Sequence, residues 1–196
     1  MDVSAYQGNI DWKKVKASGI DFAIIRLGYR GYGKAGKLVE DEYAKANLKG
    51  ATEAGLPIGA YFFSQAVSVE EARQEAQFVL EMAKDMEFDM PIVFDWEYLS
   101  DTARTADVDA RTLTDCAIAF CETIEAAGYT PMVYFNIQQA RTRMYLEELL
   151  EYKFWLALYD SSMTYQYKID MWQYTCTGSV PGISGNVDIN VYLQYD

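Results

Sequence analysis

The chain has 196 residues, of which 51% are apolar, and it carries a formal net charge of −12 at pH 7. This length and apolar content predict one hydrophobic core, so we expect residues 1–196 to form a single domain. The excess of 29 acidic over 17 basic residues argues against nucleic acid and anionic membrane surfaces as partners.

The lack of long apolar runs and of histidine limits where the protein acts and which catalytic groups it can use. No apolar run reaches the roughly 18 residues of a membrane span, and no basic and apolar leader opens the sequence, so neither a membrane span nor a signal peptide is expected in this chain. Histidine is absent, which excludes a Ser-His-Asp triad and the commonest zinc ligand. Any catalysis is therefore expected to use carboxyl groups, without a metal or another cofactor.

Apolar runs typical of strands recur along the whole chain. They cover residues 2–4, 22–28, 57–63, 91–97, 131–136, 154–159, 169–175 and 187–193. Helical patterns lie between them at roughly 41–54, 69–86, 109–127 and 138–151, with Gly55 and Gly128 where helices end. The glycine-rich segment 28–36 lacks the spacing of a phosphate-binding loop and is predicted to be a mobile loop over the mouth of the fold.

The alternation of strands and helices indicates parallel βαβ units. Eight strands with too few helices to surround them predict an α/β fold, an irregular TIM-like barrel with an incomplete ring of helices. In such barrels the active site lies at the carboxyl ends of the strands.

Two carboxyl groups stand at one such end, in "IVFDWEYL" (92–99). Strand side chains alternate between faces, so Asp95 and Glu97 point the same way, whereas Phe94 and Trp96 point the other way. Unpaired carboxylates in a buried strand are costly, which favours a functional pair over a structural one. A magnesium or calcium site is disfavoured because the stretch lacks the mixed Asp/Asn spacing of ion-binding loops.

Asp2, on the first strand, and Asp188, on the last, are the other candidate acids, although either alone fits a turn residue equally well. If the barrel closes, these two strands are neighbours and face Asp95 and Glu97. No basic partner is apparent in these motifs, and crowded like charges raise the pKa of at least one carboxyl group. A protonated acid beside an ionised partner is the requirement of glycoside hydrolysis.

Aromatic residues suggest a sugar ligand. Tyr61, Tyr134 and Trp172 are predicted near strand ends, where rings can stack on the apolar faces of sugars. Most such residues belong to cores, so these three are candidate substrate-binding residues on a weaker signal.

At this point the chain resembles a known family. The segments "DVSAYQGNIDWKKVKASGIDFAIIRLGY", "PIGAYFFSQA", "PIVFDWE", "PMVYFN", "MWQYT" and "VDIN" resemble, in order, the motifs of glycoside hydrolase family 25, the Chalaropsis-type lysozymes. The resemblance covers essentially the whole chain. One departure stands out, because many members carry a histidine where this chain has Phe62.

The resemblance implies an N-acetylmuramidase that cleaves the β-1,4 bond between N-acetylmuramic acid and N-acetylglucosamine in peptidoglycan. It implies Glu97 as general acid, Asp95 as its partner, and Asp2 and Asp188 as the remaining acids of the site. Cell-wall peptidoglycan is then the expected partner, and we expect a monomer that acts outside the cell or at the wall. Two alternatives stay open: a lectin-like module that binds glycan without cutting it, and a chitinase-like hydrolase of N-acetylglucosamine polymers.

Overall fold

The computed structural model describes residues 1–84 and 86–195. Eight of its strands close into a barrel in the ring order β1, β2, β4, β5, β6, β7, β8, β9, with β9 paired to β1. A ninth strand, β3, pairs with the outer edge of β2. The strands are β1 (Asp2–Val3), β2 (Ala23–Arg30), β3 (Leu38–Glu40), β4 (Ile58–Ser64), β5 (Ile92–Trp96), β6 (Pro131–Asn136), β7 (Lys153–Ala157), β8 (Met171–Gly178) and β9 (Val187–Tyr192).

The barrel is mixed: the expected parallel βαβ units form most of it, but its last strand runs in the opposite direction. From β1 through β2 and β4 to β8 each neighbouring pair is parallel, but β9 is antiparallel to both β8 and β1. The reason is the connection, since the loop between β8 and β9 holds no helix that could carry the chain back across the barrel. The irregular TIM-like barrel itself is confirmed.

The helices are α1 (Trp12–Ala17), α2 (Ala44–Glu53), α3 (Val69–Ala83), α4 (Ala110–Ala126) and α5 (Ile137–Thr142), with short 3-10 turns η1 (Ala5–Gln7) and η2 (Leu146–Glu148). Side-chain caps start several of them, because Ser68 and Asp109 each accept a hydrogen bond from a backbone N–H of the first turn of α3 and α4. Gly55 and Gly128 follow α2 and α4 with positive φ, as predicted. The expected helix over 138–151 is only α5 and η2.

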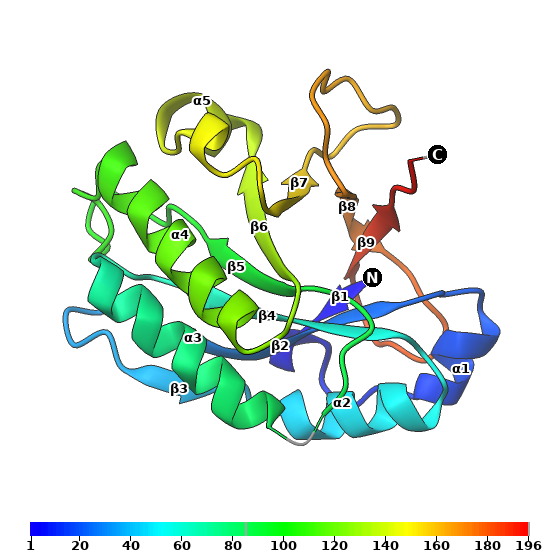
Figure 1. Ribbon diagram of the computed structural model, residues 1–196. Coiled ribbons are helices and arrows are strands. Elements are labelled where there is room, and N and C mark those ends of the chain that lie inside the picture. Colours follow the sequence, from blue (N-terminus) through cyan, green and yellow to red (C-terminus); the bar gives the residue numbers. More distant parts are fainter. Residues whose placement is uncertain (85, 196) are drawn as a thin grey trace.

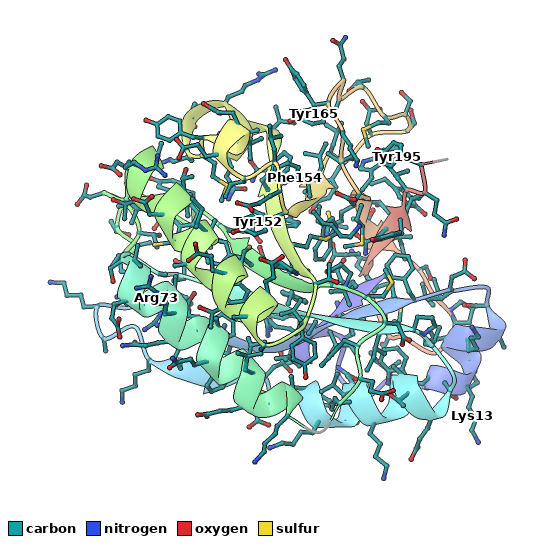
Figure 2. All side chains as sticks on the ribbon, in the orientation of Figure 1. Lys13, Arg73, Tyr152, Phe154, Tyr165 and Tyr195 are labelled. Carbon is teal, nitrogen blue, oxygen red and sulfur yellow. The ribbon has the colours of Figure 1, made fainter. Side chains whose placement is uncertain are left out.

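The ring of helices is incomplete on one flank. Figure 1 shows α2, α3 and α4 beside β2, β4, β5 and β6, whereas loops adjoin β7, β8 and β9. On this flank the loop between β7 and β8 covers the strands with aromatic side chains in place of a helix. The centre of the Phe135 ring lies 5.5 Å from that of Phe154 and 6.0 Å from that of Tyr165. Figure 2 labels Phe154 on β7 and Tyr165 on the loop that follows it.

Two apolar clusters hold the barrel. The larger lies between the strands and the helices and includes Phe62, Phe94 and Phe120. The smaller fills the barrel interior, and its buried members are Ile24, Tyr61, Val93, Met132, Tyr134, Trp155, Ala157 and Met171. The interior is thus packed with side chains, so a ligand can enter only at the end of the barrel.

The glycine-rich segment 28–36 is only partly a loop. Its first three residues complete β2, and Gly28, Tyr29 and Arg30 pair with β3 in a hairpin. Arg30 is buried, where its guanidinium contacts Glu75 on α3. The prediction of a loop over this whole segment was therefore wrong for its strand portion. Among the helices of the described residues, none is long and apolar enough to cross a membrane.

Candidate active site

A cavity of about 220 Å³ opens at the end of the barrel interior. All four predicted acids line it, and they come from β1, from β5 and the residue after it, and from β9. The lining residues are Asp2, Val3, Ser4, Tyr6, Gln7, Arg26, Tyr61, Phe63, Asp95, Glu97, Tyr134, Trp155, Tyr159, Gln173 and Asp188. The structure therefore brings together residues that lie up to 186 positions apart in the sequence.

The end of β5 contributes Asp95 and Glu97 by strand alternation. Both line the cavity, whereas the rings of Phe94 and Trp96 are fully buried on the opposite face. Phe94 packs on Phe120 of α4, and the Trp96 indole N–H donates to the carbonyl of Ala66. The apolar residues of this strand thus anchor it to the helices while its two acids face the barrel axis.

Asp2 and Asp188 reach the same cavity because β1 and β9 are adjacent. They are directly opposed in the antiparallel register of these strands. Asp188 stands near the start of β9, and the reversed direction of that strand brings its first residues to the end of the barrel where β5 finishes. The predicted adjacency of Asp2 and Asp188 is confirmed.

Two amides fix the carboxyl group of Asp2. Its Oδ2 accepts hydrogen bonds from Nε2 of Gln173 at 3.0 Å and from Nδ2 of Asn190 at 2.8 Å. Gln173 in turn accepts from the hydroxyl groups of Tyr134 and Tyr159, at 3.1 and 2.9 Å. Donors aimed at Asp2 stabilise its ionised form, so this carboxyl group is the one best placed to carry the negative charge.

Burial raises the pKa of each of the four acids. For Asp95, burial and the neighbouring Glu97 raise the pKa well above its usual range, and Asp95 Oδ1 is buried without a hydrogen-bond partner among the described residues. Burial and then the charge of Asp2 raise the pKa of Glu97. The same two causes raise the pKa of Asp188 to about 7. Protons therefore stay bound in this cluster near neutral pH.

Arg26 of β2 is a cation in the cavity wall that was not predicted from the sequence. Its Nε donates to Oδ2 of Asp41 at 2.7 Å, and its guanidinium lies 5.2 Å from the centre of the Tyr6 ring and 5.4 Å from that of Tyr29. Arg26 also acts to lower the pKa of Asp95, against the larger effect of burial. The signal was available, because a charged residue inside the apolar run "FAIIRLG" needs a partner.

The aromatic floor of the cavity differs in part from the prediction. Tyr61 and Tyr134 line it, and each packs edge-on against Trp155, with ring centroids 6.3 and 5.0 Å apart. The structure does not bring Trp172 to the cavity. Its neighbour Gln173 faces inward, so Trp172 faces outward, where its indole N–H donates to the carbonyl of Leu158 at 2.7 Å.

Convergent carboxyl groups can hold a metal ion when at least three of them face one point. Within residues 1–84 and 86–195, no group of three or more carboxylate or cysteine side chains is arranged to hold one. The expectation of a site without metal stays a prediction.

The model of the glycosyl hydrolases family 25 matches residues 1–183 of the chain. The chain belongs to this family. A curated relative, YegX of Escherichia coli K12, is 30% identical over 98% of the chain and 68% of its own length. Lysozyme M1 of Streptomyces globisporus is 29% identical over 98% of the chain and 66% of its own length.

Solved structures agree with this family 25 assignment. The modular autolysin LytC of Streptococcus pneumoniae has a TM-score of 0.86 and 30% identity over 98% of the chain, and a second structure of LytC contains a synthetic peptidoglycan ligand. The chain spans 46% of LytC, less than half its length. The lysozyme of Streptomyces coelicolor has a TM-score of 0.80 and 25% identity, with 98% of the chain and 90% of the lysozyme covered.

Phe62 is the residue of this family 25 chain that stands where many members carry a histidine, and its position shows why phenylalanine fits there. Phe62 is fully buried, and its ring lies 5.8 Å from that of Phe78 on α3, while Tyr61 and Phe63 on either side line the cavity. A side chain at position 62 thus faces the helices. The phenylalanine fills the outer core and does not line the acidic cavity.

Proposed function

We propose that the chain is an N-acetylmuramidase that hydrolyses the β-1,4 bond between N-acetylmuramic acid and N-acetylglucosamine in peptidoglycan. The observation that carries the proposal is the convergence of Asp2, Asp95, Glu97 and Asp188 in one cavity with an aromatic floor. Membership of the family, two relatives named as lysozymes, and the peptidoglycan ligand bound to LytC support it. Because β1 and β9 close the barrel, residues 1–196 would act as one catalytic domain.

In this proposal Glu97 is the general acid. Burial and the charge of Asp2 raise its pKa, which favours the protonated form, and it stands just past the end of β5, where a glycosidic oxygen entering the cavity can be reached. The proton passes to the leaving oxygen as the C–O bond breaks. The Glu97 carboxylate then removes a proton from the water that completes hydrolysis.

Two routes to the anomeric carbon fit the remaining acids. In the first, an aspartate attacks the carbon and forms a covalent glycosyl intermediate. In the second, the acetamido oxygen of the substrate attacks, and Asp95 orients the amide by accepting its N–H. Asp95 lines the cavity, and its Oδ1 has no hydrogen-bond partner among the described residues, so a substrate N–H would supply a donor that this carboxyl group lacks.

Mass spectrometry of digested peptidoglycan tests the reaction. A muramidase leaves muramic acid at the new reducing end. A reducing-end glucosamine would overturn the proposal, as would activity confined to chitin oligomers. Sedimentation with cell walls without release of soluble fragments would indicate a binding module instead.

The variant Glu97→Gln tests the general acid. It keeps the shape of the side chain but removes the proton, and we expect the turnover number to fall about 100-fold to 10,000-fold with glycan binding retained. Glu81→Gln, on the exposed face of α3, is the matched control and should retain full activity. Turnover by Glu97→Gln above about a tenth of the wild-type value would exclude Glu97 as the acid.

We also propose that the protein acts at the cell wall, outside the cytoplasm, and as a monomer. The polymer is located there, and a single chain supplies all the residues that line the cavity. Light scattering at working concentration measures the oligomeric state. A dimer whose dissociation abolishes activity would contradict the monomer.

A further inference from the structure

The backbone at Glu97 lies beyond the end of the sheet. Pairing of β5 with β6 stops at Asp95, which is opposite Tyr134, and pairing with β4 stops at Trp96, which is opposite Ser64. A strand end without ladder partners opens easily, and its buried carbonyl groups need other donors. Glu97 is therefore one residue past the part of β5 that the barrel itself holds.

Two glutamine side chains supply the missing donors, one from each side. Nε2 of Gln65, the residue after β4, donates to the carbonyl of Glu97 at 2.8 Å. Nε2 of Gln139, in the first turn of α5 after β6, donates to the carbonyl of Trp96. Gln65 and Gln139 are 0% and 2% exposed, so water does not compete for these bonds.

Each glutamine is itself fixed. The Oε1 of Gln65 accepts from the hydroxyl of Thr105 at 3.2 Å, and its Nε2 also donates to the carbonyl of Ser64 at 2.9 Å. The Oε1 of Gln139 accepts from the backbone N–H of Asn136 at 2.9 Å in the capping box of α5. These bonds fix the orientation of both side-chain amides, so each directs its Nε2 donor at β5.

The two bonds hold the two peptide planes that meet at Glu97. The carbonyl of Trp96 belongs to the plane before the Glu97 Cα, and the carbonyl of Glu97 belongs to the plane after it. Because each peptide unit is planar, fixing both planes fixes φ and ψ at Glu97 and hence the direction of its Cα–Cβ bond. The backbone thus sets the direction in which the Glu97 side chain leaves the strand, and its side-chain torsions then place the carboxyl group.

We propose that Gln65 and Gln139 are positioning residues for Glu97, which set the direction of its side chain relative to Asp95 and Asp2. The inference rests on the proposed role of Glu97 as general acid. It extends the site to two residues outside the cavity lining, because neither glutamine lines the cavity and each acts through a main-chain carbonyl.

Gln65→Met and Gln139→Met test the proposal, since methionine keeps the length of the side chain and removes the amide. With soluble glycan fragments as substrate, we expect kcat to fall about tenfold or more and KM to stay within about twofold, because a displacement near 1 Å can cost about 100-fold in rate. An unchanged kcat in both variants would overturn the proposal.

A matched control separates positioning from general stability. Thr114→Val in α4 also removes a buried hydrogen-bond partner, the acceptor of the backbone N–H of Tyr145. We expect it to lower Tm by an amount comparable to the glutamine variants and to leave kcat unchanged. A kcat loss in Thr114→Val equal to that in Gln65→Met would show that lost stability alone explains the effect.

A double-mutant cycle with Glu97→Gln gives the decisive comparison. If the glutamines act through Glu97, then adding Gln65→Met to Glu97→Gln lowers the residual rate no further. A full additional loss would overturn the positioning role. If Glu97→Gln alone is fully active, the proposed role of Glu97 as general acid fails instead. If Gln65→Met does not fold, Thr105→Val is the substitute, because it removes the hydroxyl that donates to Oε1 of Gln65. We expect Thr105→Val to lower kcat, although by less than Gln65→Met. An unchanged kcat in Thr105→Val would count against the proposal.

Discussion

At the scale of single residues, the four acids of the cavity differ in the hydrogen-bond donors that surround them. Asp2 receives two amide donors on one oxygen, whereas Asp95 has a buried oxygen without a partner among the described residues. Donors favour an ionised carboxylate, and burial without donors favours a protonated one. One fold thereby keeps a negative charge and a proton within the same cavity.

Asp2→Asn tests this division of roles. Burial and the charge of Asp2 raise the pKa of Glu97, so removing that charge lowers this pKa. Because the acid must be protonated, we expect the alkaline limb of the bell-shaped rate profile to move to lower pH, together with a lower maximal rate. The measurement is kcat/KM from pH 4 to 9, with the exposed Asp21→Asn as control. An alkaline limb that stays in place would refute the coupling.

At the scale of elements, the hairpin of β2 and β3 is fastened to α3 by a buried ion pair. Nε of Arg30 donates to Oε1 of Glu75 at 2.6 Å, and neither residue is more than 4% exposed. Arg30 also donates to the carbonyl groups of Gly36 and Glu71, so one guanidinium joins the loop of the hairpin to the helix. Burial raises the pKa of Glu75 to about 7.

Arg30→Met should be strongly destabilising. It leaves the Glu75 carboxyl group buried without its cation, a change that typically costs about 3 to 5 kcal/mol of unfolding free energy. We expect a larger loss at pH 8 than at pH 5, because the isolated Glu75 can take up a proton at the lower pH. Urea unfolding at both pH values measures the loss of unfolding free energy. The control is Arg73→Met, on the outer side of α3 (Figure 2). A loss below about 1 kcal/mol at pH 8 would contradict the role assigned to the pair.

Most elements could be predicted because their signals are local. Strand runs, helix caps and the glycines after α2 and α4 act within a few residues, and alternation alone places Asp95 and Glu97 on one face. Other features depend on distant partners. The direction of β9, the pairing of β3, and the contact of Arg26 with Asp41 arise from tertiary pairing, which sequence periodicity does not encode. Trp172 was placed on the wrong face, because a shift of one residue on β8 moves a side chain from the cavity to the outside of the barrel.

At the scale of the whole molecule, the acidic cavity lowers the stability of the barrel. Each of the four acids has a raised pKa, so each is more easily ionised in the unfolded chain than in the folded one. Such a group destabilises the folded state progressively as pH rises through the interval between the two pKa values. The rest of the barrel therefore has to offset the destabilising effect of these four acids at neutral and alkaline pH.

Asp188→Asn should stabilise the protein while it impairs the reaction. The pKa of Asp188 in the folded chain is about 7, against a usual value near 3.8. The folded state therefore binds more protons between these values, and stability falls as pH rises through that window. We expect a higher Tm for the variant at pH 8, no gain at pH 4, and lower activity at both. Asp107→Asn, at an exposed position, is the control, and an equal Tm gain at both pH values would refute the linkage.

The closure of the barrel by β1 and β9 also sets the order of events during folding. The hydrogen bond between Asp2 and Asn190 joins residues 188 positions apart, so it forms at the highest cost in loop entropy. Of the nine strands β9 is synthesised last, and until it emerges β1 and β8 present open strand edges and the cavity lacks Asp188. The four acids cannot gather before β9 has been synthesised, because the pairing of β9 with β1 both closes the barrel and brings Asp188 to the cavity.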